Sequence, residues 1–300
     1  MDYLNFYSLE KNRSTNEIKA YSAKKLLNLN NVTYNFLFIY ENKVITKEKH
    51  PFFIKTKKVS ADLRNLSLSY ITNFGNNFYL LCSLKDQDIN RISFLESCVL
   101  LNIKEALLSL KQEYASLVSA GYSLYRWQNN NLYCSRCGSK TRHDENGNST
   151  VCTKNKCGKK NFPLVYPTII VNITYKNMIL LARNIGWKKN LYSCLAGFCE
   201  QNESAEDAVR REVYEEVGLN LEKVNYKYSQ FWPFTSNLML GFEARVVSEK
   251  NTIKINKNEI DKAKWFSSKE IVELSRKNEL ILPKKEAIAR SLIEDWIYKN

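Results

Sequence analysis

The sequence predicts an α/β protein built from three successive parts. Its 300 residues are more than a typical single domain needs, and the texture of the chain changes twice. A polar segment with four clustered cysteines interrupts the chain, and strand-like runs beyond it flank one capped, highly charged helix. We therefore expect an N-terminal α/β domain over residues 1–126, a small cysteine module over 127–164 and an α/β/α sandwich over 165–300.

The first part carries aromatic and apolar runs and no recognisable catalytic constellation. FLFIY (36–40) and VITK (44–47) are separated by a short polar stretch and predict a β-hairpin. Residues 106–127 have helical periodicity and predict one helix that leads into the cysteine module. His50 stands alone, so we expect it to pack or lie on the surface rather than to bind a metal.

The cysteine module has the spacing of a zinc site. Cys134-Ser-Arg-Cys137-Gly is followed after 14 residues by Cys152-Thr-Lys-Asn-Lys-Cys157-Gly. Two cysteine pairs at this separation can place four thiolates around one Zn²⁺, with the glycines easing tight turns. We expect one structural zinc per chain on Cys134, Cys137, Cys152 and Cys157, and no role as a ligand for His143. Free or disulfide-bonded cysteines are the alternative.

The other four cysteines and the charge of the module complete this picture. Cys82, Cys98, Cys194 and Cys199 stand singly in apolar surroundings and are expected to be small core residues. Residues 134–160 include seven basic and two acidic residues, which gives this segment a net charge of +5. The whole chain has a net charge of +14. Such charge favours polyanionic partners such as nucleotides or RNA. Nucleic-acid binding by this module therefore stays open beside a purely structural zinc.

Strand signals dominate the third part. Residues 166–174 and 177–183 predict a hairpin of buried, β-branched strands around a short turn. Further strands are expected at 227–232, 238–247 and 262–266, and a closing helix at 284–299.

The helix at the centre of this part has clear start and stop signals. Ser204 is a good N-cap, with Asp207 three residues later. Gly218 suits the left-handed position that ends a helix. Val209, Val213 and Val217 recur every four residues and predict the buried stripe.

Three glutamates share an adjoining edge of this helix. Glu212, Glu215 and Glu216 stand at i, i+3 and i+4, so their carboxylates converge. Like charges at this spacing repel, and a bound divalent cation such as Mg²⁺ would remove that penalty. A merely solvated acidic edge is the alternative.

The stretch from Gly197 to Leu219 resembles the Nudix hydrolase signature at every defined position. The resemblance implies the Nudix fold, with a mixed sheet, and metal-dependent hydrolysis of a nucleoside diphosphate linked to another group. It further implies that Glu212 and Glu216 ligate Mg²⁺ or Mn²⁺, with Glu215 as a third ligand or the base. The carbonyl of Ala196 is implied as a further ligand, and Glu259 as a residue that contacts the metal or activates water. Arg211 and Glu203 would pair with each other or orient these carboxylates.

A second stretch, SQFWPFTSNLM (229–239), resembles the SQPWPFPxS motif of the NADH pyrophosphatase branch of that family. Phe231 and Thr235 replace prolines and Asn237 replaces a serine, which leaves the preference among dinucleotides open. The resemblance implies cleavage of NADH or NAD⁺ to AMP and nicotinamide mononucleotide. Aromatic rings could stack a base and polar side chains could orient it. The implied substrate contacts are Phe162, Gln230, Phe231, Trp232, Pro233, Phe234, Thr235, Ser236, Asn237 and Ala289.

Other functions remain compatible with these motifs. The same chemistry could remove NAD caps from RNA, with the basic module guiding the strand, or cleave another nucleotide such as ADP-ribose. A zinc-ribbon RNA-binding protein with an inactive Nudix domain is a third reading, against which the complete set of glutamates argues. No apolar run approaches a membrane span, and no secretory signal is visible. We expect a cytoplasmic protein without a membrane partner, and the family resemblance implies a homodimer.

Overall fold

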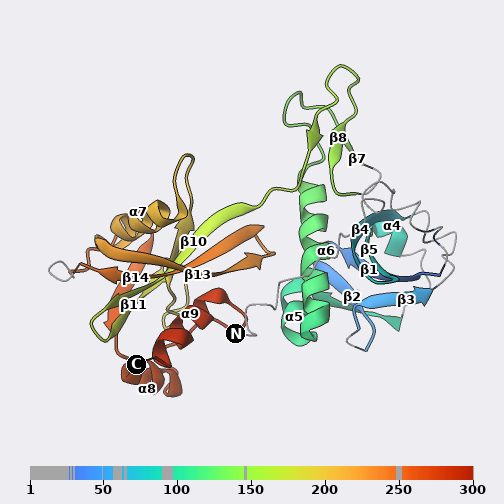
Figure 1. The fold of residues 1–300 in the computed structure, drawn as a ribbon. Helices are drawn as coiled ribbons and strands as arrows, with labels where there is room; N and C mark the ends of the chain where they lie inside the picture. Colours follow the sequence, from blue (N-terminus) through green and yellow to red (C-terminus); the bar gives the residue numbers. More distant parts are fainter. Residues whose placement is uncertain are drawn as a thin grey trace. The chain divides into compact units, whose positions relative to one another are not determined.

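The computed structural model describes residues 27, 29, 31–48, 50–56, 63, 66–89, 97–144, 147–247 and 252–299. This described part of the chain divides into two compact units between Leu164 and Val165 (Figure 1). Both are α/β units, as the sequence predicts. Among the helices described, none is both long and apolar enough to cross a membrane.

The N-terminal unit is built on a six-stranded sheet. The strand order is β4-β5-β1-β2-β6, and β3 pairs with β1. The predicted hairpin is confirmed, because β1 and β2 pair antiparallel through Ile39 and Val44. The strands and the short helix are β1 (Thr33–Tyr40), β2 (Lys43–Thr46), β3 (Phe52–Thr56), β4 (Ser67–Phe74), β5 (Asn77–Ser83), α4 (Asp86–Ile89) and β6 (Val99–Asn102).

The stretch 106–127 is helical as predicted, but it is divided between two helices. These are α5 (Ile103–Ser109) and α6 (Gln112–Asn130). Leu110 separates them in an extended conformation (φ −80°, ψ 154°) and is buried. The apolar pattern continues through this break because Leu110 still packs inward, so periodicity alone did not reveal it. Helix α6 lies close against the sheet, since a Cβ at Gly121 would press on Leu37.

The cysteine module is a small three-stranded sheet that is tied to the N-terminal unit. Its strands are β7 (Thr141–His143), β8 (Thr150–Cys152) and β9 (Lys160–Asn161), in the order β7-β8-β9. Gln128 on α6 donates from Nε2 to Ser69 Oγ (2.7 Å) on β4 and to the carbonyl of Gly147 (2.6 Å). Gly147 has a positive φ of 74°, and a Cβ there would collide with Ser69. The module is therefore fixed to α6 and β4 by a buried amide.

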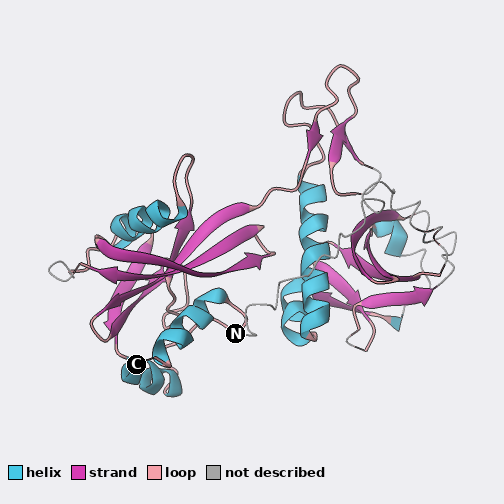
Figure 2. Cartoon of the chain, in the orientation of Figure 1, coloured by secondary structure: helices cyan, strands magenta, loops and turns pink. Residues whose placement is uncertain are grey.

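The C-terminal unit is a mixed sheet between helices (Figure 2). The strand order is β13-β14-β10-β11-β15, with β12 paired to β10, and β10 runs parallel to β14. All five predicted strands are present, although β13 begins six residues earlier than expected. The strands are β10 (Tyr166–Tyr175), β11 (Met178–Asn184), β12 (Leu195–Phe198), β13 (Leu221–Trp232), β14 (Asn237–Val246) and β15 (Ile260–Phe266).

Helices cover both faces of this sheet. Odd positions of β10, such as Ile169 and Val171, pack with α7 (Ala205–Val217), whereas Ile170 packs with α9 (Ile288–Ile297). Figure 1 shows α7 and α9 on opposite sides. The closing helix starts at Ile288 rather than 284. Helix α8 (Ser268–Arg276) was not predicted, although a capping box of Ser267 and Glu270 marks its start.

The single cysteines differ in burial. Cys82 and Cys194 are buried, as expected of core residues. Cys98 and Cys199 are only partly buried, and each packs against the edge of a hydrophobic core. None of the eight cysteines, all of which lie in the described part of the chain, forms a disulfide.

Candidate active site

Helix α7 begins and ends as its sequence predicts. The Ser204 hydroxyl accepts from the backbone N–H of Asp207 (3.1 Å) and donates to Oδ2 of that residue (2.6 Å). Gly218 takes the left-handed conformation (φ 69°) and its N–H donates to the carbonyl of Tyr214. The three valines of the stripe are fully buried against the sheet. The acidic edge of α7 is therefore held rigidly at the surface of the core.

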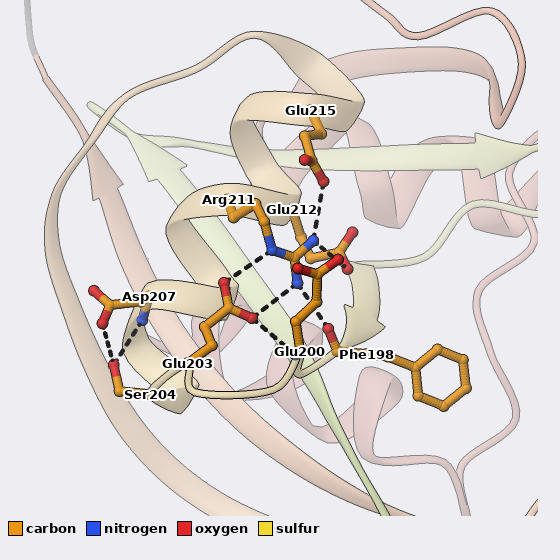
Figure 3. A network of polar contacts seen from close by, with 8 residues as sticks. All are labelled: Phe198, Glu200, Glu203, Ser204, Asp207, Arg211, Glu212 and Glu215. Carbon is orange, nitrogen blue, oxygen red and sulfur yellow. Dashed lines mark hydrogen bonds and ion pairs between the residues drawn. The ribbon is translucent and has the colours of Figure 1, made fainter.

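Arg211 organises this acidic edge (Figure 3). Its Nε and Nη2 donate to the two carboxylate oxygens of Glu203 at 2.8 and 3.0 Å. Its Nη1 donates to Glu212 (3.0 Å) and Glu215 (2.9 Å), and Nη2 also donates to the carbonyl of Phe198 (2.8 Å). All five guanidinium N–H groups are thus used. The arginine holds the pKa of Glu203 below its usual range, and that carboxylate raises the pKa of Arg211.

Glu216 is a buried carboxylate that lacks a cationic partner within the described residues. Only 4% of the residue is exposed, and its Oε2 accepts no hydrogen bond from any described group. Burial, followed by the charges of Glu212, Glu259 and Glu215, raises the pKa of Glu216 to about 8. Burial also raises the pKa of Glu212, although Arg211 opposes this shift. A buried, unpaired carboxylate among like charges is costly unless a cation joins it.

The turn before β15 brings Glu259 to the same place. The backbone N–H groups of Lys254 and Asn256 donate to the carbonyls of Val217 and Glu216, both at 2.8 Å. This segment therefore runs along the C-terminal end of α7. Glu259, which is exposed, follows at the tip of the turn. The carboxylates that the sequence predicts from two distant segments are thus brought together.

Gly197 leaves the space that one of these carboxylates occupies. It lies in β12, and a Cβ at that position would collide with the carboxyl group of Glu212. Ala196, whose carbonyl is a predicted metal ligand, directly precedes it in the same strand. The site thus combines four carboxylates, one of them buried and unpaired, beside the backbone of β12. Such an oxygen-rich donor set fits a hard divalent cation.

The aromatic segment SQFWPFTSN forms the end of β13 and the turn into β14. The rings of Trp232 and Phe234 meet edge to face, with centroids 5.2 Å apart. Ser236 has a positive φ of 60° in the turn. Asn237 is buried, and its Nδ2 donates to Thr168 Oγ1 (2.8 Å) while its Oδ1 has no partner among the described residues. The segment is therefore a tight, aromatic turn with one unused amide oxygen.

Gln230 has a structural role that the sequence did not reveal. Its Nε2 donates to the carbonyl of Glu286 (2.7 Å), and its Oε1 accepts from the N–H of Ile288 (2.8 Å). The residue is only 3% exposed. Gln230 thus fixes the start of α9, whose N-cap residue supplies no side-chain hydrogen bond. Ala289, a predicted substrate contact, is buried in the first turn of that helix.

The four cysteines of the cysteine module are close enough together to hold one metal ion. Their sulfur atoms all lie within 4.8 Å of one another, with Cys134 and Cys157 3.8 Å apart and Cys137 and Cys152 3.5 Å apart. Hydrogen bonds from Ser139 lower the pKa of Cys137 to about 6, which favours the thiolate that binds metal. Desolvation raises the pKa of Cys152 to about 12. His143 is not part of this cluster.

Comparisons with known proteins agree with this geometry. The NUDIX domain model matches residues 165–290. The chain is 32% identical over 225 residues to the NAD-capped RNA hydrolase NudC of Pseudomonas syringae, which covers 74% of each protein. This chain belongs to the Nudix family.

Two human relatives of this Nudix chain match over shorter shares of their own length. The mitochondrial NAD(P)H pyrophosphatase NUDT13 is 37% identical over 212 residues, which cover 67% of this chain and 60% of that protein. The NAD-capped RNA hydrolase NUDT12 is 36% identical over 206 residues, covering 65% of this chain and 44% of that protein. The chain therefore spans about half of the length of these curated relatives.

Proposed function

We propose that this chain hydrolyses the pyrophosphate bond of NADH or NAD⁺, which releases AMP and nicotinamide mononucleotide. The observation that carries the proposal is the buried, unpaired carboxylate of Glu216 beside Glu212 and Glu259. Such a cluster of carboxylates favours a bound divalent cation, and the cation would in turn neutralise the charge of a pyrophosphate. The similarity to an NAD(P)H pyrophosphatase supports the choice of a nicotinamide dinucleotide.

Mg²⁺ or Mn²⁺ would be held by the Ala196 carbonyl and by Glu212, Glu215, Glu216 and Glu259. When bound, the ion neutralises pyrophosphate charge and lowers the pKa of the attacking water. In the reaction, the water oxygen forms one P–O bond, and the bridging P–O bond breaks so that each product keeps one phosphate. Glu215, whose side chain is 54% exposed and ion-paired with Arg211, is the third ligand or the base that accepts the water proton. Arg211 and Glu203 hold the carboxylate array in place.

The substrate bases are proposed to lie against the aromatic turn. Trp232 and Phe234 offer ring surface, and the unused amide oxygen of Asn237 can accept from a base or an amide. Gln230 acts indirectly, by fixing the helix that carries Ala289. The remaining proposed contacts in this unit are Phe231, Pro233, Thr235 and Ser236, whereas Phe162, which the resemblance implies as a contact, belongs to the N-terminal unit.

Product analysis tests this proposal. The protein is incubated with Mg²⁺ or Mn²⁺ and, separately, NADH, NAD⁺ and ADP-ribose, and the products are separated by chromatography. We expect AMP from NADH and NAD⁺ and no adenosine diphosphate-ribose as an intermediate. Failure to cleave either dinucleotide would overturn the proposal, and faster cleavage of ADP-ribose would reassign the substrate.

Removal of NAD caps from RNA is the second candidate function. The basic cysteine module favours it, because its net charge of +5 suits a phosphate backbone. The names of two of the relatives, NudC and NUDT12, point the same way. NAD-capped RNA added to the same assay tests this candidate. Cap removal would release nicotinamide mononucleotide and leave RNA with a 5′-monophosphate.

We further propose that the four-cysteine cluster holds one structural Zn²⁺, that the protein is a homodimer and that it is cytoplasmic. The distances between the sulfur atoms support the first of these. Metal analysis of the purified protein should find one zinc per chain, and Cys152→Ser should lose it. Sedimentation velocity should give twice the chain mass, and a fluorescent fusion should report the compartment.

A further inference from the structure

The loop between β11 and β12, residues 184–190, exposes a tryptophan between an apolar and two basic side chains. Trp187 is 41% exposed and Ile185 is 52% exposed. Lys188 and Lys189 follow directly and are also exposed. Gly186 (φ 81°) permits the turn, and the N–H of Trp187 donates to the carbonyl of Asn184 (3.2 Å). The loop is thus ordered by its backbone while its side chains face outward.

This loop adjoins the carboxylate cluster. The N–H of Ile185 donates to the carbonyl of Glu259 (2.9 Å), and Asn184 pairs with Ile260 across β11 and β15. The Glu259 carboxylate in turn interacts electrostatically with Glu212. The 184–190 loop therefore lies at the edge of the proposed site of hydrolysis, within the same compact unit.

The chemistry of this edge differs from that of the site. Lys188 and Lys189 of the loop are not the only basic residues beside the carboxylates. Lys257, in the turn before β15, and Lys262, in β15, are also exposed. Lysines repel a divalent cation but attract phosphates, and an exposed indole can stack on any nucleobase. A free dinucleotide offers only two phosphates, whereas an RNA chain continues past the cleaved bond.

We propose that the 184–190 loop binds the first nucleotides of an RNA chain that follows the NAD moiety. Trp187 stacks on a base, and Lys188 and Lys189 neutralise the adjoining phosphates. The inference rests on the proposed function and deepens its second candidate, the removal of NAD caps from RNA, because the loop would hold the RNA beside the same site of hydrolysis. A protein partner is disfavoured because lysines flank the single indole and charge depletion marks the centre of protein interfaces.

A binding experiment tests the loop without turnover. A NAD-capped, single-stranded RNA of about ten nucleotides carries a 3′ fluorophore, and its affinity is measured by anisotropy without added divalent ions. The variants are Trp187→Ala, Trp187→Phe and the pair Lys188→Ala with Lys189→Ala. The matched control is Lys269→Ala with Lys277→Ala, which removes the same charge from α8 and its C-cap. That helix follows Phe266, at the end of β15 opposite to Glu259.

We expect Trp187→Ala to weaken RNA binding about tenfold, Trp187→Phe to restore most of it, and KM for NADH to stay unchanged. The lysine pair should lower the slope of log affinity against log salt by about 1.4, at 0.7 per phosphate contact on a single strand. The α8 control should change RNA affinity less than Trp187→Ala does, and the salt slope less than the lysine pair does. RNA affinity equal to wild type in Trp187→Ala or in the lysine pair would overturn the inference, as would an equal loss in the α8 control.

The two proposals fail separately. If the wild type cleaves NADH but Trp187→Ala binds RNA normally, the loop inference alone is wrong. If no dinucleotide is cleaved while RNA binding still depends on Trp187, the proposed hydrolysis is wrong and the contact between the loop and RNA stands.

Discussion

Glu216→Gln should make the metal-free protein more stable at neutral pH. The unfolded chain ionises this carboxyl near its ordinary value of 4.5, whereas in the fold its pKa is about 8. A carboxyl whose pKa is raised by folding contributes stability below pH 4.5 and loses it as pH rises through 8. With these two values, linkage gives a loss of about 3.5 kcal/mol for the wild type between about pH 5 and pH 8. Glutamine cannot ionise, so the variant escapes this loss.

The assay is urea unfolding at several pH values, on protein purified without Mg²⁺ or Mn²⁺ and measured without added divalent ions. Glu222→Gln, at an exposed position of β13, is the matched control and should follow the wild type. Adding Mn²⁺ should raise the free energy of unfolding of the wild type and not that of Glu216→Gln, because an ion stabilises only a folded state that binds it. The reasoning is refuted if the wild type keeps its stability from about pH 5 to pH 8, or if Glu222→Gln behaves like Glu216→Gln.

Three further changes test other contacts of the site. Gly197→Ala should lower turnover at least about tenfold, because the added methyl displaces the carboxylate of Glu212. The far-ultraviolet circular dichroism spectrum should be unchanged, which would show that the fold is retained. Full activity would contradict the claim that Gly197 leaves the space for this carboxylate. Arg211→Lys should reduce kcat, since one ammonium cannot replace five directed donors; a kcat equal to wild type would show that the network is not needed. Gln230→Leu should cost about 1–3 kcal/mol of unfolding free energy, because the N–H of Ile288 loses its acceptor, whereas a purely substrate-contacting role would raise KM and leave stability unchanged.

Local signals predicted α7 almost completely. A serine N-cap, a glycine in the left-handed region and valines every four residues all act within one helix, so their consequences can be computed from spacing alone. The same is true of the paired strands at the start of the C-terminal unit. Such features depend on neighbours in sequence, which the chain displays directly.

Contacts between distant segments were not predictable in the same way. Gln230 caps α9 across 58 positions of sequence, and nothing in its own neighbourhood distinguishes that role from substrate binding. The break between α5 and α6 was not predicted because Leu110, the residue at the break, is buried like the apolar residues of the two helices. The carbonyl of Phe198, which accepts from Arg211, is a backbone atom that every residue has. The resemblance to a family supplied Glu259, which local charge patterning would have left as a solvated residue.

The most direct test of the account is the formation of AMP from NADH as Mn²⁺ is added, with the wild type and Glu216→Gln compared under identical conditions. We expect the wild type to release AMP only with the ion present. The variant should be slower by more than roughly 100-fold, which exceeds the usual cost of changing a residue that merely supports a metal ligand. Full activity of Glu216→Gln, or equal AMP release by the wild type without any divalent ion, would contradict the central claim that this buried carboxylate holds the catalytic cation.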